Sequence, residues 1–240
     1  TGHDRKRFLE NYWIKNRNAI ERGTKGEIAG WVIPAGQHSK ADAAMAVNDM
    51  IDQGLEFHTA DEDFTVGEIE VKQGDYIVRG DQPYRTIADI YFSTQQFPIT
   101  NPRPYDDLGW TFHYMRDIET DVVGDQALLS SPMTAVQGHV TAPGGIEGGG
   151  TTVVVAHTGD NNMVTLRFRF ADLPMAAAEE AFEVDGQQFL AGSFIIENGN
   201  TPEIAEALLE LGLTGRATDE TMADVPTHDL DIPRIGYIHS

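Results

Sequence analysis

The chain has 240 residues, of which 40% are hydrophobic, and its 17 basic and 38 acidic residues give a net charge of −21. This apolar content predicts a folded chain with one sizeable core or two small ones. The negative charge disfavours nucleic acid and anionic lipid as partners, because both are bound through clustered Lys and Arg. The lack of cysteine excludes disulfides, thiolate nucleophiles and Cys-built zinc sites.

No stretch approaches the ~18 uninterrupted apolar residues of a membrane span, and residues 1–8 lack the apolar core of a signal peptide. Only five of the 17 basic residues are lysine. A surface rich in acid and poor in lysine suits a saline habitat, where salt screens the repulsion between carboxylates. An acidic protein from an ordinary habitat would have the same composition, so both interpretations stay open.

Residues 1–28 predict an N-terminal amphipathic helix. Its apolar residues recur at helical spacing over residues 5–22, and Gly23 offers a left-handed stop. These apolar residues are Phe8, Leu9, Tyr12, Trp13 and Ile20.

Residues 29–96 predict a first α/β unit. A buried strand at 30–36 is followed by a helix at 40–53, which Gly54 ends, and by a second strand at 55–58. Residues 64–66 and 71–78 predict a hairpin, and Pro83 opens a further helix.

Residues 152–222 predict a second unit, because adding 118 to positions 54–78 keeps a matching register. Leu55 then falls on Leu173, Phe64 on Phe182, Val66 on Val184, Gly74 on Gly192 and Ile77 on Ile195. The second unit is completed by a strand at 152–157, a helix capped by Asp160 or Asn162, and a helix that begins at Thr201-Pro202. The predicted fold is therefore α/β, with two duplicated strand-helix-strand-hairpin-helix units.

A Pro- and Gly-rich connector, residues 97–151, is expected between the units. It predicts loop around one short helix that Asp106 or Asp107 caps and that carries Trp110, Tyr114 and Met115. Residues 223–240 predict a linker and, from Ile232, the first strand of a truncated third unit. We therefore expect an internal segment of a longer polypeptide.

The spacings of the histidines do not predict a metal site. A zinc peptidase needs two His one helical turn apart beside a Glu, or His-x-x-Glu with a later His, and neither pattern occurs. The eight are His3, His38, His58, His113, His139, His157, His228 and His239. Residues 58–63 hold one His and three acids, but they lack EF-hand spacing, and a solvated acidic loop is the more typical interpretation.

Other candidate sites also favour structural interpretations. The run Gly144–Gly150 precedes a strand and lacks the lysine of a phosphate loop, so it predicts a flexible connector. Asp160-Asn161-Asn162 follows a strand, where open α/β sheets bind ligands, yet a helix cap is favoured. No serine lies on a nucleophile elbow, and Ser193 matches Asp75 in the repeat, which predicts a structural position. No catalytic, cofactor-binding or metal-ligating residue is assigned.

Several motifs carry a resemblance to a known family. They are Gly30-Trp31-Val32-Ile33-Pro34-Ala35-Gly36-Gln37, Gly54-Leu55-Glu56-Phe57-His58, Gly74-Asp75-Tyr76-Ile77-Val78, Asp81-Gln82-Pro83-Tyr84-Arg85 and Tyr105-Asp106-Asp107-Leu108-Gly109-Trp110-Thr111. In this order they resemble the region downstream of the catalytic domain in large bacterial zinc carboxypeptidase-like proteins. Pro226-Thr227-His228 and Pro233-Arg234-Ile235-Gly236 resemble the lead into the glutamine-amidotransferase-like domain that often follows.

The resemblance implies a non-catalytic accessory segment of a secreted or periplasmic zinc metallocarboxypeptidase-like protein. The zinc, its ligands and the general-base Glu of that family would lie in an upstream domain, so the segment itself carries no cofactor. The implied partners are that peptidase domain and the downstream amidotransferase-like domain, with self-association through the termini as a further expectation. The alternative is a non-enzymatic α/β module that binds a small ligand near residues 36–38 and 157–160.

Overall fold

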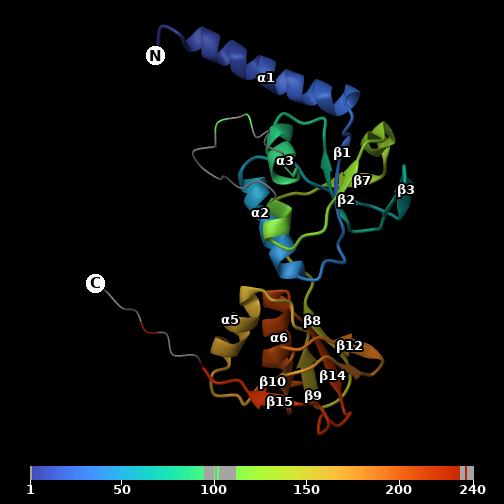
Figure 1. Ribbon diagram of the computed structural model, residues 1–240, viewed down its shortest axis with the longest axis vertical. Helices are drawn as coiled ribbons and strands as arrows, with labels where there is room; N and C mark the ends of the chain where they lie inside the picture. Colours follow the sequence, from blue (N-terminus) through green and yellow to red (C-terminus); the bar gives the residue numbers. More distant parts are fainter. Residues whose placement is uncertain (1, 95–99, 101, 103–111, 233–235, 237–240) are drawn as a thin grey trace. The chain divides into compact units, whose positions relative to one another are not determined.

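The computed structural model describes residues 2–94, 100, 102, 112–232 and 236. The chain forms two compact units: unit 1 comprises residues 1–38 and 42–140, and unit 2 comprises residues 39–41 and 141–240. Helices and strands follow one another through both units, which confirms the predicted α/β class (Figure 1). None of the helices in the described ranges combines the length and apolar character that crossing a bilayer requires.

Unit 1 is built on a five-stranded sheet in the order β6-β1-β5-β2-β7. Strands β1 and β2 both pair antiparallel with β5, so they run in the same direction and need the crossover that α2 supplies. The elements are α1 (Arg5–Lys25), β1 (Gly30–Ile33), α2 (Lys40–Asp52), β2 (His58–Ala60), β3 (Phe64–Val66), β4 (Ile69–Val71), β5 (Tyr76–Arg79), α3 (Arg85–Tyr91), α4 (Phe112–Met115), β6 (Asp121–Val123), the 3-10 helix η1 (Gln126–Ser130) and β7 (Met133–Ala135).

Unit 2 is built on a six-stranded sheet in the order β15-β10-β13-β9-β14-β8. Only the pair β14–β8 is parallel among its described strand pairs. The elements are β8 (Gly145–Gly148), β9 (Thr152–Val155), α5 (Asn161–Arg169), β10 (Ala176–Ala178), β11 (Phe182–Val184), β12 (Gln187–Phe189), β13 (Phe194–Ile196), α6 (Pro202–Leu211), β14 (Thr214–Thr218) and β15 (Thr227–Asp229).

The two units share one order of strands and helices from β1 to α3 and from β9 to α6. Strands β2, β3 and β4 recur 118 positions later as β10, β11 and β12 with unchanged lengths. Hydrogen bonds recur as well: Ala60 N donates to Asp75 O at 2.9 Å, and Ala178 N donates to Ser193 O at 3.0 Å. The predicted repeat therefore has a common topology in both units, and gene duplication itself stays a prediction.

Each sheet separates two apolar layers, because alternate residues of a strand face opposite sides. In unit 1, Trp31 and Ile33 pack with the helices, whereas Val32 packs with η1 residue Leu128. In unit 2 the helix side is the larger core, with Val153 and Val155 among its members. The opposite side holds Val154, Val184, Phe189 and Ile195 beneath the hairpin β11-β12.

Several predicted boundaries in the first half were wrong. Gly23 does not end α1 but lies buried inside it, where a Cβ would come 2.1 Å from the carbonyl carbon of Gly80, and the helix ends at Gly26. The hairpin partner of β3 is β4 rather than residues 71–78, because β5 is drawn into the sheet between β1 and β2. The strand expected at 55–58 begins at His58.

The connector prediction was also wrong, because much of residues 97–151 is strand. Strand β6 pairs with β1 and β7 pairs with β2, so both complete the sheet of unit 1. Strand β8, within the glycine run, pairs with β14 and belongs to unit 2. The short helix is observed as α4, but Asp106, Asp107 and Trp110 lie outside the described residues. The strand expected from Ile232 also lies largely outside them.

Candidate functional site

The described histidines lie apart, and several have a structural partner. His113 Nδ1 lies 2.9 Å from the carbonyl oxygen of Tyr91, and His139 Nε2 lies 2.8 Å from Asp52 Oδ1. His228 Nδ1 lies 3.3 Å from a carboxylate oxygen of Glu179. Within the described ranges, no group of three or more His, Asp or Glu side chains could hold a metal ion.

The acidic loop at residues 58–63 is tied to the neighbouring hairpin. The Asp63 carboxylate accepts a hydrogen bond from Gln73 N at 2.9 Å and one from Lys72 Nζ at 3.3 Å. The backbone N–H of Gln73, with help from Lys72, lowers the pKa of Asp63. This carboxylate therefore fixes the loop.

Polar groups at the two predicted strand-end segments serve the fold. Gln37 is buried and exchanges hydrogen bonds with the backbone of Glu119, donating at 3.0 Å and accepting at 2.9 Å. Asp75 Oδ1 accepts from Ala35 N at 2.7 Å, and Ser193 Oγ accepts in the same way from His157 N at 3.1 Å. Ser193 is fully buried and occupies the predicted structural position.

Asp160 caps helix α5, as the sequence predicts. Its carboxylate accepts from Asn162 N at 2.7 Å and from Thr158 Oγ1 at 2.7 Å. The Asn162 side chain donates in turn to the carbonyl oxygen of Leu211 at 2.8 Å. These side chains therefore join α5 to α6.

The run Gly144–Gly150 is not a flexible connector, since it contains the edge strand β8. A Cβ on Gly144 would come 2.3 Å from the carbonyl oxygen of Leu208, so α6 lies directly against the start of the run. A Cβ on Gly150 would likewise come 2.1 Å from the carbonyl carbon of Thr218, so Gly144 and Gly150 are required for close backbone packing.

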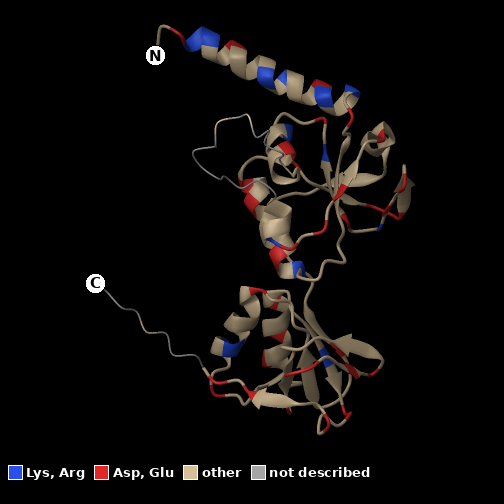
Figure 2. Ribbon diagram, in the orientation of Figure 1, with Lys and Arg blue, Asp and Glu red and all other residues tan. Residues whose placement is uncertain are grey.

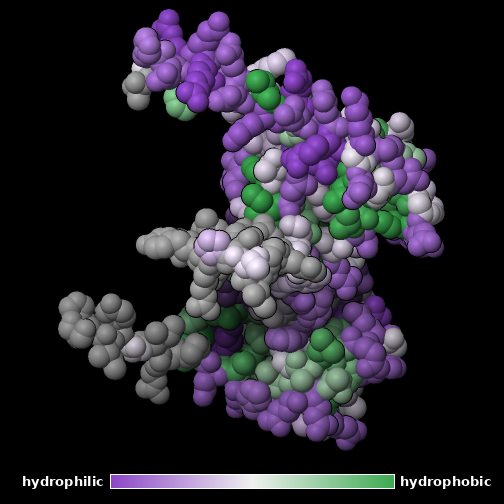
Figure 3. Space-filling view, turned by 45° about the horizontal axis from the view of Figure 1, so that its top comes forward, coloured by the Kyte–Doolittle hydropathy of each residue, from purple (hydrophilic) through white to green (hydrophobic). Residues whose placement is uncertain are grey.

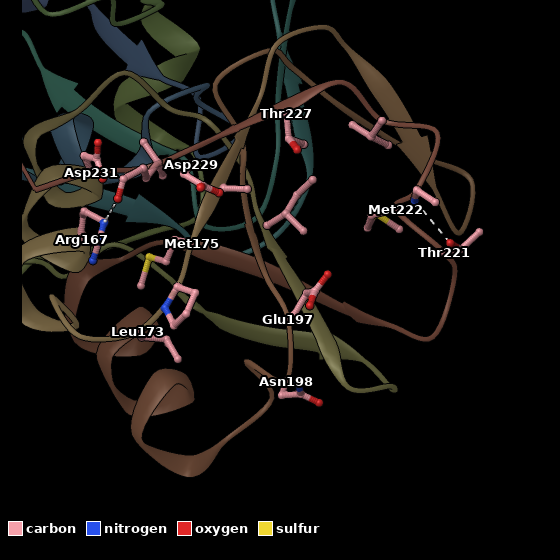
Figure 4. A pocket seen from close by; sticks show the side chains of 16 residues that line it. Arg167, Leu173, Met175, Glu197, Asn198, Thr221, Met222, Thr227, Asp229 and Asp231 are labelled. Carbon is pink, nitrogen blue, oxygen red and sulfur yellow. Dashed lines mark hydrogen bonds between the residues drawn. The ribbon is translucent and has the colours of Figure 1, made fainter.

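A groove of about 930 Å³ lies in unit 2. Its floor is Ala176 of β10, which lies in register between Ile195 of β13 and Asp229 of β15. Further apolar side chains line it: Leu173, Pro174, Met175, Met222 and Val225. In the view of Figure 4, Arg167 and Asp231 lie at one end and Thr221 and Met222 at the other.

The groove has an acidic rim. Glu197, Asp229 and Asp231 are exposed carboxylates along it. The single lining cation, Arg167, is buried and donates to three carbonyl oxygens, those of Leu230 at 2.7 Å, Phe170 at 2.9 Å and Ala171 at 3.1 Å. Its guanidinium is therefore occupied by backbone carbonyl oxygens, and the exposed charged groups at the rim are the three carboxylates.

The same place in unit 1 is filled. His58 stands 118 positions before Ala176 and pairs with Ile77 as Ala176 pairs with Ile195. Arg79 corresponds to Glu197, and it donates to Leu129 O of η1 at 2.9 Å and to both carboxylate oxygens of Asp81 at 2.9 and 2.7 Å. A large imidazole and an ion pair thus stand where unit 2 has a methyl group and a free acid.

These groups have shifted pKa values. Burial, and next the nearby charge of Arg79, lower the pKa of His58. The hydrogen bonds from Arg79 lower the pKa of Asp81. His58 Nδ1 is buried without a hydrogen-bond partner, so protonation of this ring is disfavoured in the folded unit.

Helix α1 carries a second candidate surface, which we call the aromatic stripe: Phe8, Leu9, Tyr12 and Trp13. These side chains are between 57% and 67% exposed, although they share a helical stripe with buried Ala19 and Gly23. In Figure 1 the N-terminal half of α1 extends past α3. The sequence predicted this stripe, and the structure leaves it uncovered.

The groove was missed from the sequence, because its lining comes from separated segments. One sequence signal could have indicated the groove: at the 118-residue offset, the small Ala176 corresponds to the large His58. Searches against protein-family models, curated proteins and solved structures found no match for this chain.

Proposed function

We propose that the chain is a non-catalytic accessory segment of a zinc metallocarboxypeptidase-like protein and that it binds protein. In this proposal the zinc and the hydrolytic machinery reside in an upstream domain, an amidotransferase-like domain follows, and the whole acts outside the cytoplasm. The support for this parent is the resemblance of the sequence motifs. The polar groups that the sequence offered for chemistry, such as Asp160 and Ser193, make hydrogen bonds that hold the fold.

The aromatic stripe on α1 is the observation that carries the binding role. Exposed apolar area costs about 25 cal/mol per Å², so four large exposed side chains on one helix favour a partner. Tyr and Trp are also enriched at the centre of protein interfaces. Farther along α1, Ala19 and Gly23 are buried against the rest of unit 1, and within the stripe Tyr12 Oη lies 3.1 Å from Tyr84 Oη.

The proposal is tested in the longer protein. The reading frame upstream of Thr1 should encode His-x-x-Glu followed by a distant His. Hydroxyl-radical footprinting of that protein should show Trp13 protected relative to the isolated chain at a dilution where that chain is monomeric. The matched control is Ile14, which is 40% exposed on a different face of α1 and should react equally in both.

Two results would contradict the proposal. One tightly bound zinc per isolated chain would show that the segment has its own metal site, and peptide hydrolysis by it would show that the segment is itself catalytic. Equal modification of Trp13 in the longer protein and in the isolated chain diluted to a monomer would show that the stripe is not an interface.

A further inference from the structure

Helix α1 is strongly basic in an otherwise acidic chain. It holds seven of the 17 basic residues and two of the 38 acidic ones, which gives +5 for the helix and leaves −26 on the rest. Figure 2 shows these cations along α1 and the acids over both units. The guanidinium of Arg17 lies 4.7 Å from the ring centroid of Trp13. The partner of the stripe should therefore offer apolar area beside negative charge.

A flat anionic membrane does not fit this stripe. The stripe shares its helical face with Ala19 and Gly23, which are buried against unit 1, so part of that face is already turned toward protein. The face of α1 in view in Figure 3 is mostly hydrophilic. The charge of −26 on the rest of the chain would also be repelled by anionic lipid.

The groove of unit 2 has the complementary character. Its lining combines apolar side chains, Met175, Ile195 and Met222 among them, with polar groups, and the carboxylates of Glu197, Asp229 and Asp231 lie among the latter. An aromatic side chain inserted over Ala176 would meet methionine, leucine and isoleucine, while flanking Lys and Arg would reach the rim. At the corresponding position unit 1 has His58 and Arg79 in place of Ala176 and Glu197, and the guanidinium of Arg79 is bound to Leu129 O and Asp81.

We propose that α1 of one copy docks its aromatic stripe in the unit 2 groove of a second copy. The inference rests on the proposed function in one respect, since it takes α1 to be a protein interface. Aromatic side chains bury roughly 150–250 Å² each, so one stripe falls short of the ~800 Å² per partner of a standard interface. A reciprocal exchange makes the contact twice and closes a two-fold dimer, which brings the buried area into that range.

The experiment is sedimentation velocity on the full chain, at low and high salt. We expect a dimer that weakens as salt rises, because complementary charges are screened. Trp13→Ser should weaken self-association at least about tenfold, since it removes a central aromatic anchor. Ile14→Ser, on another face of α1, is the matched control and should leave the dimer unchanged.

The groove is tested by giving it the residues of unit 1. The double variant Ala176→His and Glu197→Arg should abolish the dimer by filling the floor and reversing a rim charge. Leu209→Ser is the control, because Leu209 is an exposed apolar residue of α6 outside the groove. A labelled peptide of residues 3–25 should bind the Trp13→Ser chain and not the double variant.

Three outcomes would overturn the inference. One is a monomer at all concentrations together with no binding of the peptide. Another is a dimer that Trp13→Ser breaks and the double variant does not, which would indicate that the stripe pairs elsewhere. The third is recruitment of the monomer to vesicles of anionic lipid. In each case protection of Trp13 in the longer protein would still decide the proposed function separately.

Discussion

Units 1 and 2 have the same strand order but cover the outer side of their sheets differently. In unit 1 the 3-10 helix η1 places Leu128, fully buried, against Val32 and Ile77. In unit 2 the loop between β14 and β15 supplies only the partly buried Met222 and Val225. With the same topology, the outer face of the sheet is therefore covered in unit 1, whereas it has an open groove in unit 2. The difference lies in a few side chains and one short helix, so substitutions there should separate structure from binding.

The largest effect is expected from Leu128→Ala. Removing this buried side chain should destabilise unit 1 by about 2–5 kcal/mol, through lost burial and a residual cavity. All three tryptophans lie in unit 1, so tryptophan fluorescence during urea unfolding reports this unit. Hydrogen exchange of β13 should stay unchanged. A parallel loss of protection in unit 2 would show that the two units do not unfold independently.

A smaller pair of effects compares Asp75 with Ser193. Each accepts a hydrogen bond from the backbone just after an equivalent strand, β1 for Asp75 and β9 for Ser193, but Asp75 also accepts from Lys72 N at 2.8 Å. We expect Asp75→Ala to cost about 3 kcal/mol and Ser193→Ala about 1–2 kcal/mol, because the carboxylate leaves more buried donors unsatisfied. Fluorescence-detected unfolding measures the first and hydrogen exchange of β9 the second. Equal losses of unfolding free energy for the two variants would contradict the view that the additional hydrogen bond of Asp75 makes it the more stabilising residue.

The pH dependence of unit 1 should show two losses of stability toward acid. The pKa of His58 is lowered by burial and by Arg79, so its neutral form stabilises the fold fully above the ordinary value of 6.5, and this contribution is lost as pH falls through the folded pKa. The pKa of Asp81 is lowered by Arg79, so its contribution is present above 3.8 and is lost below.

Urea midpoints of unit 1 measured from neutral to acid pH check both steps. His58→Gln should remove the upper step, and Asp81→Asn should remove the lower one. In unit 2 the residue that corresponds to His58 is Ala176, which does not titrate. Hydrogen exchange of unit 2 should therefore not show a loss of stability from this position at the higher pH. An upper step that persists in His58→Gln would assign it to another group.

The smallest effect is expected from the exposed side of α6. Leu209→Ser should change the unfolding free energy of unit 2 by less than about 0.5 kcal/mol, because the residue is 61% exposed. Hydrogen exchange of the neighbouring β14 measures this. A large loss there would mean that this exposed face is covered, which would move the binding surface of unit 2 away from the groove.

Much of unit 2 was predictable because its signals are local. Helix α6 was predicted from its first residues and is observed with Thr201 accepting at its start, Pro202 inside and a left-handed Gly212 at its end. Asp160 was equally a recognisable cap for α5. Such caps involve residues within about four positions of one another, so their chemistry is visible in a short stretch of sequence.

Partner choice in the sheets was not predictable in this way. The sequence indicated strands near β1, β5 and β9, but their hydrogen-bond partners lie far along the chain. Residues 71–78 were expected in a hairpin, whereas β5 lies between β1 and β2. Gly23 resembles a helix stop, yet its missing side chain serves close packing on Gly80. The groove likewise depends on segments that only the folded sheet brings together.

The sequence by itself determined the α/β class, the 118-residue register and the aromatic, basic character of α1. These follow from periodicity, caps and composition, which are properties of short stretches. Only the tertiary structure decided that β6 and β7 complete unit 1, that Arg167 is consumed by carbonyl oxygens and that the floor at Ala176 stays open. The physical reason is that a backbone or side-chain polar group takes whichever partner the folded chain brings within hydrogen-bond distance.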